Sequence, residues 1–325
     1  MSKPKVLLTR PDIPAESLEK LKAFADVEIQ PEERPITKEE LLKSIKGKDG
    51  LLCMLTDPID AEVIEAAGEN LKIIATMSVG YEHIDRKTAE KHKIAVSNTP
   101  FVSSDSVAEL TVTLMLVAGR RVVEAANVIK RGDWTYSWGP QWLCGAGLAG
   151  ATIGFVGMGK IARSVLSRCQ AFGIKEAIYY DKFHPIEPAE KMGCKFKPLD
   201  EVLSSADFIV TLTNLNEETR HMYNKATFAK MKKTAVFINT SRGGVVDQDA
   251  LYEALKHGVI RAAALDVSEP EPLPKESKLL TLDNLLITPH IGSAETNVRV
   301  QMGDLAVSNI LAVLEGKDPV TPVRD

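Results

Sequence analysis

The sequence carries little net charge, and it has no long run of either basic or apolar residues. Its 40 Lys and Arg stand against 44 Asp and Glu, which gives a formal net charge of −4. Proteins that bind nucleic acid or a membrane surface usually carry a basic patch, and the sequence has no such cluster. A membrane-spanning helix needs about 18 apolar residues in succession, a length that no segment reaches. We therefore expect neither nucleic acid nor a membrane as a partner.

Cysteine is scarce as well, and the few cysteines lack the spacing of a metal site. Cys53, Cys144, Cys169 and Cys194 lie far apart in the chain. Isolated cysteines of this kind are typical of reduced thiols in the cytoplasm. The apolar run Val6–Leu8 is too short for the core of a signal peptide. The sequence thus predicts a cytoplasmic protein without a metal.

The 325 residues are too many for one ordinary hydrophobic core. Short β-branched runs alternate with amphipathic segments, which is typical of parallel α/β sheets. Strands are expected at residues 5–9, 50–55, 71–77, 94–97, 152–156, 177–180, 208–213, 235–239, 261–267 and 285–288, and helices at 14–24, 37–45, 60–67, 85–91, 103–130 and 294–314. An irregular segment over 132–150 separates two groups of strands, so we expect two α/β units.

A glycine-rich turn opens the second group. Thr152–Val156 has the pattern of a buried strand, and Gly157-Met158-Gly159-Lys160-Ile161-Ala162 follows it directly. In this G-x-G-x-x-A pattern the first glycine permits a tight turn and the second lets the backbone approach a pyrophosphate. The following helix would offer free N–H groups and the positive end of its dipole to the phosphates. The pattern predicts a dinucleotide site.

Asp181 ends the next expected strand, where a carboxylate would accept hydrogen bonds from the ribose hydroxyls of the adenosine. The same charge would repel a 2′-phosphate. NAD(H) is therefore favoured as the cofactor, with NADP(H) as the alternative because Lys182 stands beside the carboxylate.

Three further residues suit the chemistry of a small 2-oxo acid. Arg242 and His290 each follow an expected strand, and Glu271 comes shortly after another. Ligands of open parallel sheets bind beyond the carboxyl ends of the strands. His290 would give a proton to the carbonyl group, Glu271 would hold the imidazole, and Arg242 would bind the substrate carboxylate. These roles predict hydride transfer between a nicotinamide and a 2-oxo or 2-hydroxy acid.

The chain resembles the D-isomer-specific 2-hydroxy acid dehydrogenase family over essentially its whole length, most specifically in its later part. The matching segments are Phe228–Lys232, Phe237–Asp247, Ala264–Val267, Glu271–Pro274 and Thr288–Ala294. Within the family the chain most resembles the animal glyoxylate/hydroxypyruvate reductases, on Met77–Gly80 and Trp142–Gly145. The resemblance implies reduction of glyoxylate or hydroxypyruvate to glycolate or D-glycerate.

The resemblance also implies two doubly wound parallel-sheet domains. Residues 1–104 with 290–325 would form a flavodoxin-like substrate domain, and residues 105–289 a Rossmann domain for NAD(P). The family's catalytic roles carry over to Arg242, Glu271 and His290, with Glu269 as a competitor for the Glu role. The residues implied for the cofactor are Gly157, Met158, Gly159, Lys160, Ile161, Asp181, Thr240, Arg242, Asp266, His290 and Gly292, and those implied for the substrate are Val79, Gly80, Arg242, His290, Ser293 and Trp138.

Other functions remain open at this point. A related enzyme could act on phosphoglycerate or D-lactate, although phosphoglycerate enzymes often have an additional regulatory domain. Formate dehydrogenases of the family have Gln at the position of Glu271, which argues against that activity. A corepressor that senses the dinucleotide shares the same three residues but carries disordered tails. Rates with glyoxylate and hydroxypyruvate would separate these functions.

All three tryptophans lie in the segment 132–150, at Trp134, Trp138 and Trp142. A loop cannot easily bury three indoles by itself. They would either cover a groove of their own subunit or form the core of a subunit interface, where aromatic residues are enriched. The resembling reductases are homodimers in which this arm wraps the partner and a Trp matching Trp138 reaches the partner's active site. We expect a homodimer.

Overall fold

The computed structural model describes residues 3–323, which form two compact units. The first unit comprises the chain up to Ser103 and again from Ala294, and the second is Ser104–Ser293. The sequence-based division put residues 290–293 in the first unit. The structure groups them with the second unit, where the backbone N–H groups of His290, Ile291 and Gly292 all donate to Asp266.

The first unit is built on a five-stranded parallel sheet in the order β2-β1-β3-β4-β5. Its strands are β1 (Lys5–Leu8), β2 (Asp26–Ile29), β3 (Gly50–Cys53), β4 (Ile73–Thr76) and β5 (Ala95–Ser97). This 2-1-3-4-5 order is the flavodoxin-like one, as predicted. Strand β2 was not predicted, because its DVEI sequence carries two acidic residues and it lies at the sheet edge.

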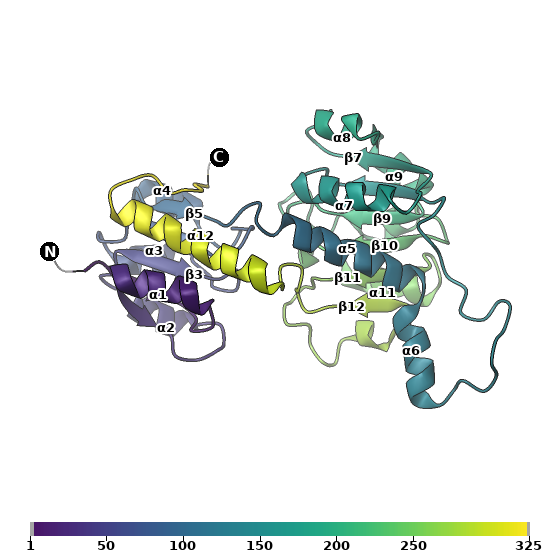
Figure 1. The fold of residues 1–325 in the computed structure, drawn as a ribbon, viewed down its shortest axis with the longest axis horizontal. Helices are drawn as coiled ribbons and strands as arrows, with labels where there is room; N and C mark the ends of the chain where they lie inside the picture. The colour runs from purple at the N-terminus through teal and green to yellow at the C-terminus, as the bar shows by residue number, and fades with distance from the viewer. Residues whose placement is uncertain (1–2, 324–325) are drawn as a thin grey trace. The chain divides into compact units, whose positions relative to one another are not determined.

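The helices of this unit are α1 (Ala15–Phe24), α2 (Lys38–Ser44), α3 (Ala61–Ala67), α4 (Arg86–Lys91) and α12 (Thr296–Leu314). The last helix packs beside α1 against the sheet, although nearly the whole chain separates the two in sequence (Figure 1). Apolar side chains of α12, including Met302 and Ile310, complete the core over β1, β3 and β4. The chain therefore returns to the first unit after completing the second.

The second unit is built on a seven-stranded parallel sheet in the order β12-β11-β10-β9-β6-β7-β8. The strands are β6 (Thr152–Val156), β7 (Glu176–Tyr180), β8 (Lys195–Phe196), β9 (Phe208–Thr211), β10 (Val236–Asn239), β11 (Ala262–Leu265) and β12 (Leu285–Ile287). Apart from the extra strand β12, this is the Rossmann order, with β6 as its first strand. The predicted fold class is therefore confirmed, although the short edge strand β8 was missed.

The helices of the second unit are α5 (Ser104–Gly119), α6 (Val122–Arg131), α7 (Lys160–Gln170), α8 (Glu187–Lys191), α9 (Leu199–Ser205), α10 (Lys225–Phe228) and α11 (Gln248–Lys256), with 3-10 turns at Gly243–Val245 and Lys278–Thr281. Among the described residues, no helix has both the length and the apolar character needed to cross a membrane.

The prediction of one helix over 103–130 was wrong, because the chain turns between α5 and α6. Arg121 has a left-handed backbone, with φ 56°. The carbonyl of Gly119 accepts a hydrogen bond of 2.7 Å from the N–H of Ala146, so the returning loop ends α5. A Cβ atom at Gly119 would lie 2.8 Å from the carbonyl oxygen of Ala146, which explains the glycine. Apolar residues continue at helical spacing on both sides, so the pattern alone could not predict this break.

Candidate active site

The glycine-rich turn after β6 has the geometry that a pyrophosphate requires. Gly157 has φ +86°, and a Cβ atom there would lie 2.6 Å from the carbonyl oxygen of Leu212. Gly159 has an ordinary backbone, and a Cβ atom there would meet nothing within 4 Å. The protein itself therefore does not require glycine at position 159, whereas a closely approaching ligand would. Lys160 and Ile161 open α7, whose first N–H groups have no partner within the helix.

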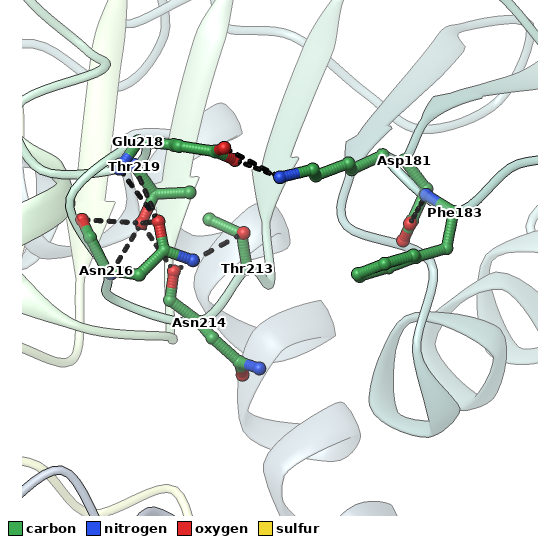
Figure 2. Close-up of polar contacts among 8 residues, drawn as sticks. Asp181, Phe183, Thr213, Asn214, Asn216, Glu218 and Thr219 are labelled. Carbon is green, nitrogen blue, oxygen red and sulfur yellow. Dashed lines mark hydrogen bonds and ion pairs between the residues drawn. The ribbon is translucent and has the colours of Figure 1, made fainter. Parts of the chain in front are cut away.

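Asp181 follows β7 directly and is held by two backbone amides. Its Oδ2 accepts from the N–H of Met158 at 2.8 Å, and its Oδ1 accepts from the N–H of Phe183 at 2.9 Å. Figure 2 shows the carboxylate beside Phe183. Each oxygen of an ionised carboxylate has a second lone pair, so Asp181 can still accept hydrogen bonds from ribose hydroxyls. The N–H of Met158, unlike the Asp181 oxygens, has no further hydrogen-bonding capacity, because its one hydrogen is bonded to Asp181.

The imidazole of His290 contacts the carboxylate of Glu271. Its Nδ1 lies 2.9 Å from Glu271 Oε2, and the two side chains are 29% and 32% exposed. Because an ionised carboxylate only accepts hydrogen bonds, Nδ1 must carry the hydrogen of this bond. The other ring nitrogen, Nε2, is then on the opposite side of the ring from Glu271. This geometry suits a group that exchanges a proton at Nε2.

The loop that carries His290 is anchored by Asp266, which follows β11. The Asp266 carboxylate accepts from the backbone N–H of Ile291 at 2.9 Å and of Gly292 at 2.8 Å, and from the hydroxyl of Thr288 at 2.6 Å. Its carbonyl also accepts from the N–H of His290 at 2.9 Å. His290 has φ 54°, a backbone conformation that non-glycine residues adopt only when their surroundings fix it. Asp266 thus positions the imidazole, a role that sequence reasoning did not find.

Arg242 follows β10 and lies near the same pair. Its Nη1 donates to the carbonyl of Ser241 at 2.7 Å, and its own carbonyl accepts from Asn239 Nδ2 at 2.9 Å. The charge of Arg242 also acts on Glu271. The guanidinium is half-buried, so it can contribute both charge and N–H donors to an anionic ligand.

The pKa of Glu271 lies below its ordinary value. Burial alone would raise this pKa, but the hydrogen bond and the charge of His290, the amide of Ser268 and the charge of Arg242 together lower it. A carboxyl group with a depressed pKa stabilises the fold above its unfolded-state pKa. That contribution is lost as the pH falls through the folded-state value.

Glu269, the alternative to Glu271 as the partner of His290, contacts other residues. Its carboxylate pairs with Arg220 at 2.9 Å and lies 3.3 Å from His221 Nε2. Burial would raise the pKa of Glu269, but these two partners lower it. The imidazole of His290 therefore meets Glu271, two residues further along.

The remaining predicted residues lie in different surroundings. The hydroxyl of Thr240 lies 2.8 Å from that of Thr111 on α5. Ser293 lies in the loop between β12 and α12 that carries His290, and it is the last residue of the second unit. Val79 and Gly80 belong to the first unit, where their carbonyls accept from Asn98 Nδ2 at 2.7 Å and Ser78 Oγ at 2.6 Å. With both carbonyls engaged in this way, the loop conformation is fixed, which the sequence did not indicate.

Comparisons of the sequence and of the structure with known proteins identify the same family. Residues 112–292 match the model of the D-isomer specific 2-hydroxyacid dehydrogenase, NAD binding domain. The chain is 45% identical over 315 residues to a glyoxylate reductase/hydroxypyruvate reductase from Homo sapiens, covering 96% of this chain and 95% of that protein. It is 46% identical over 322 residues to a glyoxylate reductase from Thermofilum pendens, covering 98% and 94%. A crystal structure of a glyoxylate reductase from Paecilomyes thermophila superposes with a TM-score of 0.89 at 29% identity, covering 99% of each chain.

Proposed function

The chain belongs to the D-isomer specific 2-hydroxyacid dehydrogenase family and is an NAD(P)-dependent oxidoreductase, and from that premise we propose that it reduces glyoxylate and hydroxypyruvate. The products are glycolate and D-glycerate. The observation that carries the proposal is the contact of His290 with Glu271 beside Arg242, in a chain whose relatives bear the names of these reductases.

The substrate is held by charge and by the backbone. Arg242 binds the carboxylate of the 2-oxo acid through two N–H groups and also polarises the carbonyl group at carbon 2. In the first unit, the backbone N–H groups of Val79 and Gly80 are proposed as substrate donors on the strength of the family resemblance. The glycine-rich turn Gly157–Ala162 would hold a nicotinamide dinucleotide, which would supply the hydride for carbon 2.

His290 supplies the proton. Its Nε2 donates a proton to the carbonyl oxygen of the substrate, while Nδ1 keeps its bond to Glu271. Glu271 fixes the orientation of the ring and stabilises its charged form before transfer. One hydride at carbon 2 and one proton at oxygen complete the 2-hydroxy acid. Chiral chromatography of the product from hydroxypyruvate tests this proposal, since L-glycerate would contradict it.

Replacing Glu271 with glutamine is expected to lower the apparent pKa of the pH–rate profile for reduction. Removing the carboxylate removes the charge that favours the protonated ring, so activity should be lost at a lower pH than in the wild type. Initial rates across the pH range measure the shift. Glu269→Gln is the matched control, because Glu269 pairs with Arg220 instead. A shift in the control and none in Glu271→Gln would assign the role to Glu269.

The enzyme is expected to prefer NADH to NADPH. The Asp181→Ser variant is expected to lower the ratio of kcat/KM for NADH to kcat/KM for NADPH by about tenfold or more, which would reduce or reverse the preference. The cause is repulsion between the carboxylate and a 2′-phosphate, which serine removes. The ratio of kcat/KM for the two cofactors measures the change. A wild-type enzyme that favours NADPH would contradict the assignment to Asp181.

A homodimer is the second part of the proposal, and the surface of the second unit supports it. Trp134, Trp138 and Trp142 are 53%, 76% and 37% exposed. The apolar residues Val122, Val123 and Ile129 of α6 are also exposed, and α6 and the following loop extend away from the body of their unit (Figure 1). Clustered exposed apolar side chains are typical of a surface that another protein covers.

We expect Trp138→Ala to change the ratio of hydroxypyruvate to glyoxylate activity by on the order of tenfold, with a smaller effect on cofactor affinity. The reason is that Trp138 from the partner subunit would limit the space for the side group of the substrate. Kinetics with both acids measure the ratio, and Trp134→Ala is the matched control. Sedimentation of the wild type as a monomer at micromolar concentration would contradict this role.

A further inference from the structure

An ion pair joins the loops that follow β7 and β9. Lys182, the residue after Asp181, places its Nζ 2.7 Å from Oε1 and 2.6 Å from Oε2 of Glu218. Figure 2 shows this contact bridging from the side of Asp181 to Glu218. The ammonium group thus meets both oxygens of one carboxylate.

The loop that presents Glu218 is fixed by its own hydrogen bonds. Asn216 Oδ1 accepts from the N–H of Glu218 at 2.9 Å and from the N–H of Thr219 at 3.1 Å. The hydroxyl of Thr219 donates to the carbonyl of Asn214 at 2.7 Å. Figure 2 shows Asn216 and Thr219 in this turn, below Glu218. A turn fixed in this way presents the carboxylate at a defined place.

The pair lies at the edge where the dinucleotide is proposed to bind. In the sheet β6 lies between β7 and β9, so a bond between the loops after β7 and β9 spans the carboxyl end of β6. The glycine-rich turn begins at that end, where Gly157 packs against Leu212 of the β9 loop. Lys182 is thus a cation beside the carboxylate that is expected to receive the ribose hydroxyls.

We propose that Glu218 is a specificity-determining residue for the cofactor, because it engages Lys182 and so withholds that cation from a 2′-phosphate. The inference rests on the proposed NADH preference and adds a second cause to Asp181. With Lys182 neutralised by Glu218, the net charge of the three side chains is −1, which repels a phosphate. Without Glu218 the net charge is zero, and the ammonium group can turn toward the phosphate.

The effect on folding is expected to be small. The Lys182 and Glu218 side chains are 60% and 65% exposed, and exposed ion pairs contribute little to stability. Glu218→Gln therefore tests cofactor choice rather than folding. Glu217→Gln is the matched control, since it removes the same charge one residue earlier and Glu217 forms no ion pair within residues 3–323.

The experiment compares wild type, Glu218→Gln, Glu217→Gln, Lys182→Met and the double variant Lys182→Met/Glu218→Gln. Calorimetry gives the affinities for 2′,5′-ADP and for ADP, and kinetics give kcat/KM for NADPH and NADH. Glu218→Gln should raise the preference for the 2′-phosphorylated ligand about fivefold in both measurements, the size of one exposed ion pair. The double variant should lose this gain, and Glu217→Gln should match the wild type.

An unchanged ratio in Glu218→Gln, or a gain that survives in the double variant, would overturn the inference. A wild type whose affinity for 2′,5′-ADP falls in Lys182→Met would overturn it too, because Lys182 would then already serve the phosphate. The binding measurements do not depend on turnover. A wild type that reduces neither acid would therefore count against the proposed reaction, while the calorimetry would still decide the role of Glu218.

Discussion

Replacing His290 with asparagine is expected to lower kcat by about 100- to 10,000-fold while leaving NADH binding nearly intact, since that is the usual cost of losing a general acid. Asparagine can still donate a hydrogen bond but cannot release a proton near neutral pH. The Glu271 carboxylate would keep the hydrogen bond from the Ser268 amide, at 2.9 Å, so the segment 268–271 should keep its conformation. Steady-state kinetics give kcat, and titration of the NADH fluorescence gives the affinity.

His257→Asn is the matched control for this variant. His257 ends α11 in the same unit and also pairs with a glutamate, Glu253, at 3.1 Å. Its loss is expected to change kcat by less than about twofold, because an exposed pair of this kind carries little energy. Wild-type turnover in His290→Asn would remove His290 from the reaction. Loss of NADH binding in that variant would mean that the histidine holds the cofactor instead.

Arg242→Gln is expected to lower kcat/KM for both 2-oxo acids by about 3 kcal/mol, or roughly 100-fold, through a higher KM and a lower kcat. The charge of Arg242 is proposed to act twice, on the substrate carboxylate and on the polarised carbonyl. A contact made equally in the ground state and in the transition state would change KM alone, so a loss in kcat measures the action on the polarised carbonyl.

Arg220→Gln serves as the control for Arg242. Arg220 is an arginine of the same unit whose side chain is 51% exposed and pairs with Glu269. Its kinetics are expected to stay within about twofold of the wild type. Unchanged kinetics in Arg242→Gln, or an equal loss in Arg220→Gln, would contradict the assignment of the carboxylate site to Arg242.

The parts of the fold that depend on local patterns could be predicted from the sequence. The buried strand β6, the turn at Gly157 and the helix α7 each have their own local signal, and together they indicated a Rossmann unit. The edge strands β2 and β8 have weak signals because they are short and half-exposed. The break after Gly119 is caused by the carbonyl and amide of Ala146, a contact between distant residues that no local pattern records.

The same distinction applies to the candidate site. His290, Arg242 and Asp181 lie at strand ends, so the topology of a parallel sheet was enough to select them. The pairing of His290 with Glu271 depends instead on how the segment after β11 folds, and the sequence left Glu269 open. The anchoring of the His290 loop by Asp266 and the bond between Lys182 and Glu218 join separate loops, so only the structure reveals them.

Steady-state oxidation of NADH with glyoxylate, with hydroxypyruvate and with pyruvate as the comparator tests whether the enzyme reduces the first two acids. We predict that kcat/KM for glyoxylate and for hydroxypyruvate exceeds that for pyruvate by on the order of tenfold or more, because pyruvate adds a methyl group to glyoxylate and lacks the hydroxyl group of hydroxypyruvate. A higher kcat/KM for pyruvate would indicate a D-lactate enzyme, and no oxidation of NADH or NADPH with any of the three acids would contradict the account.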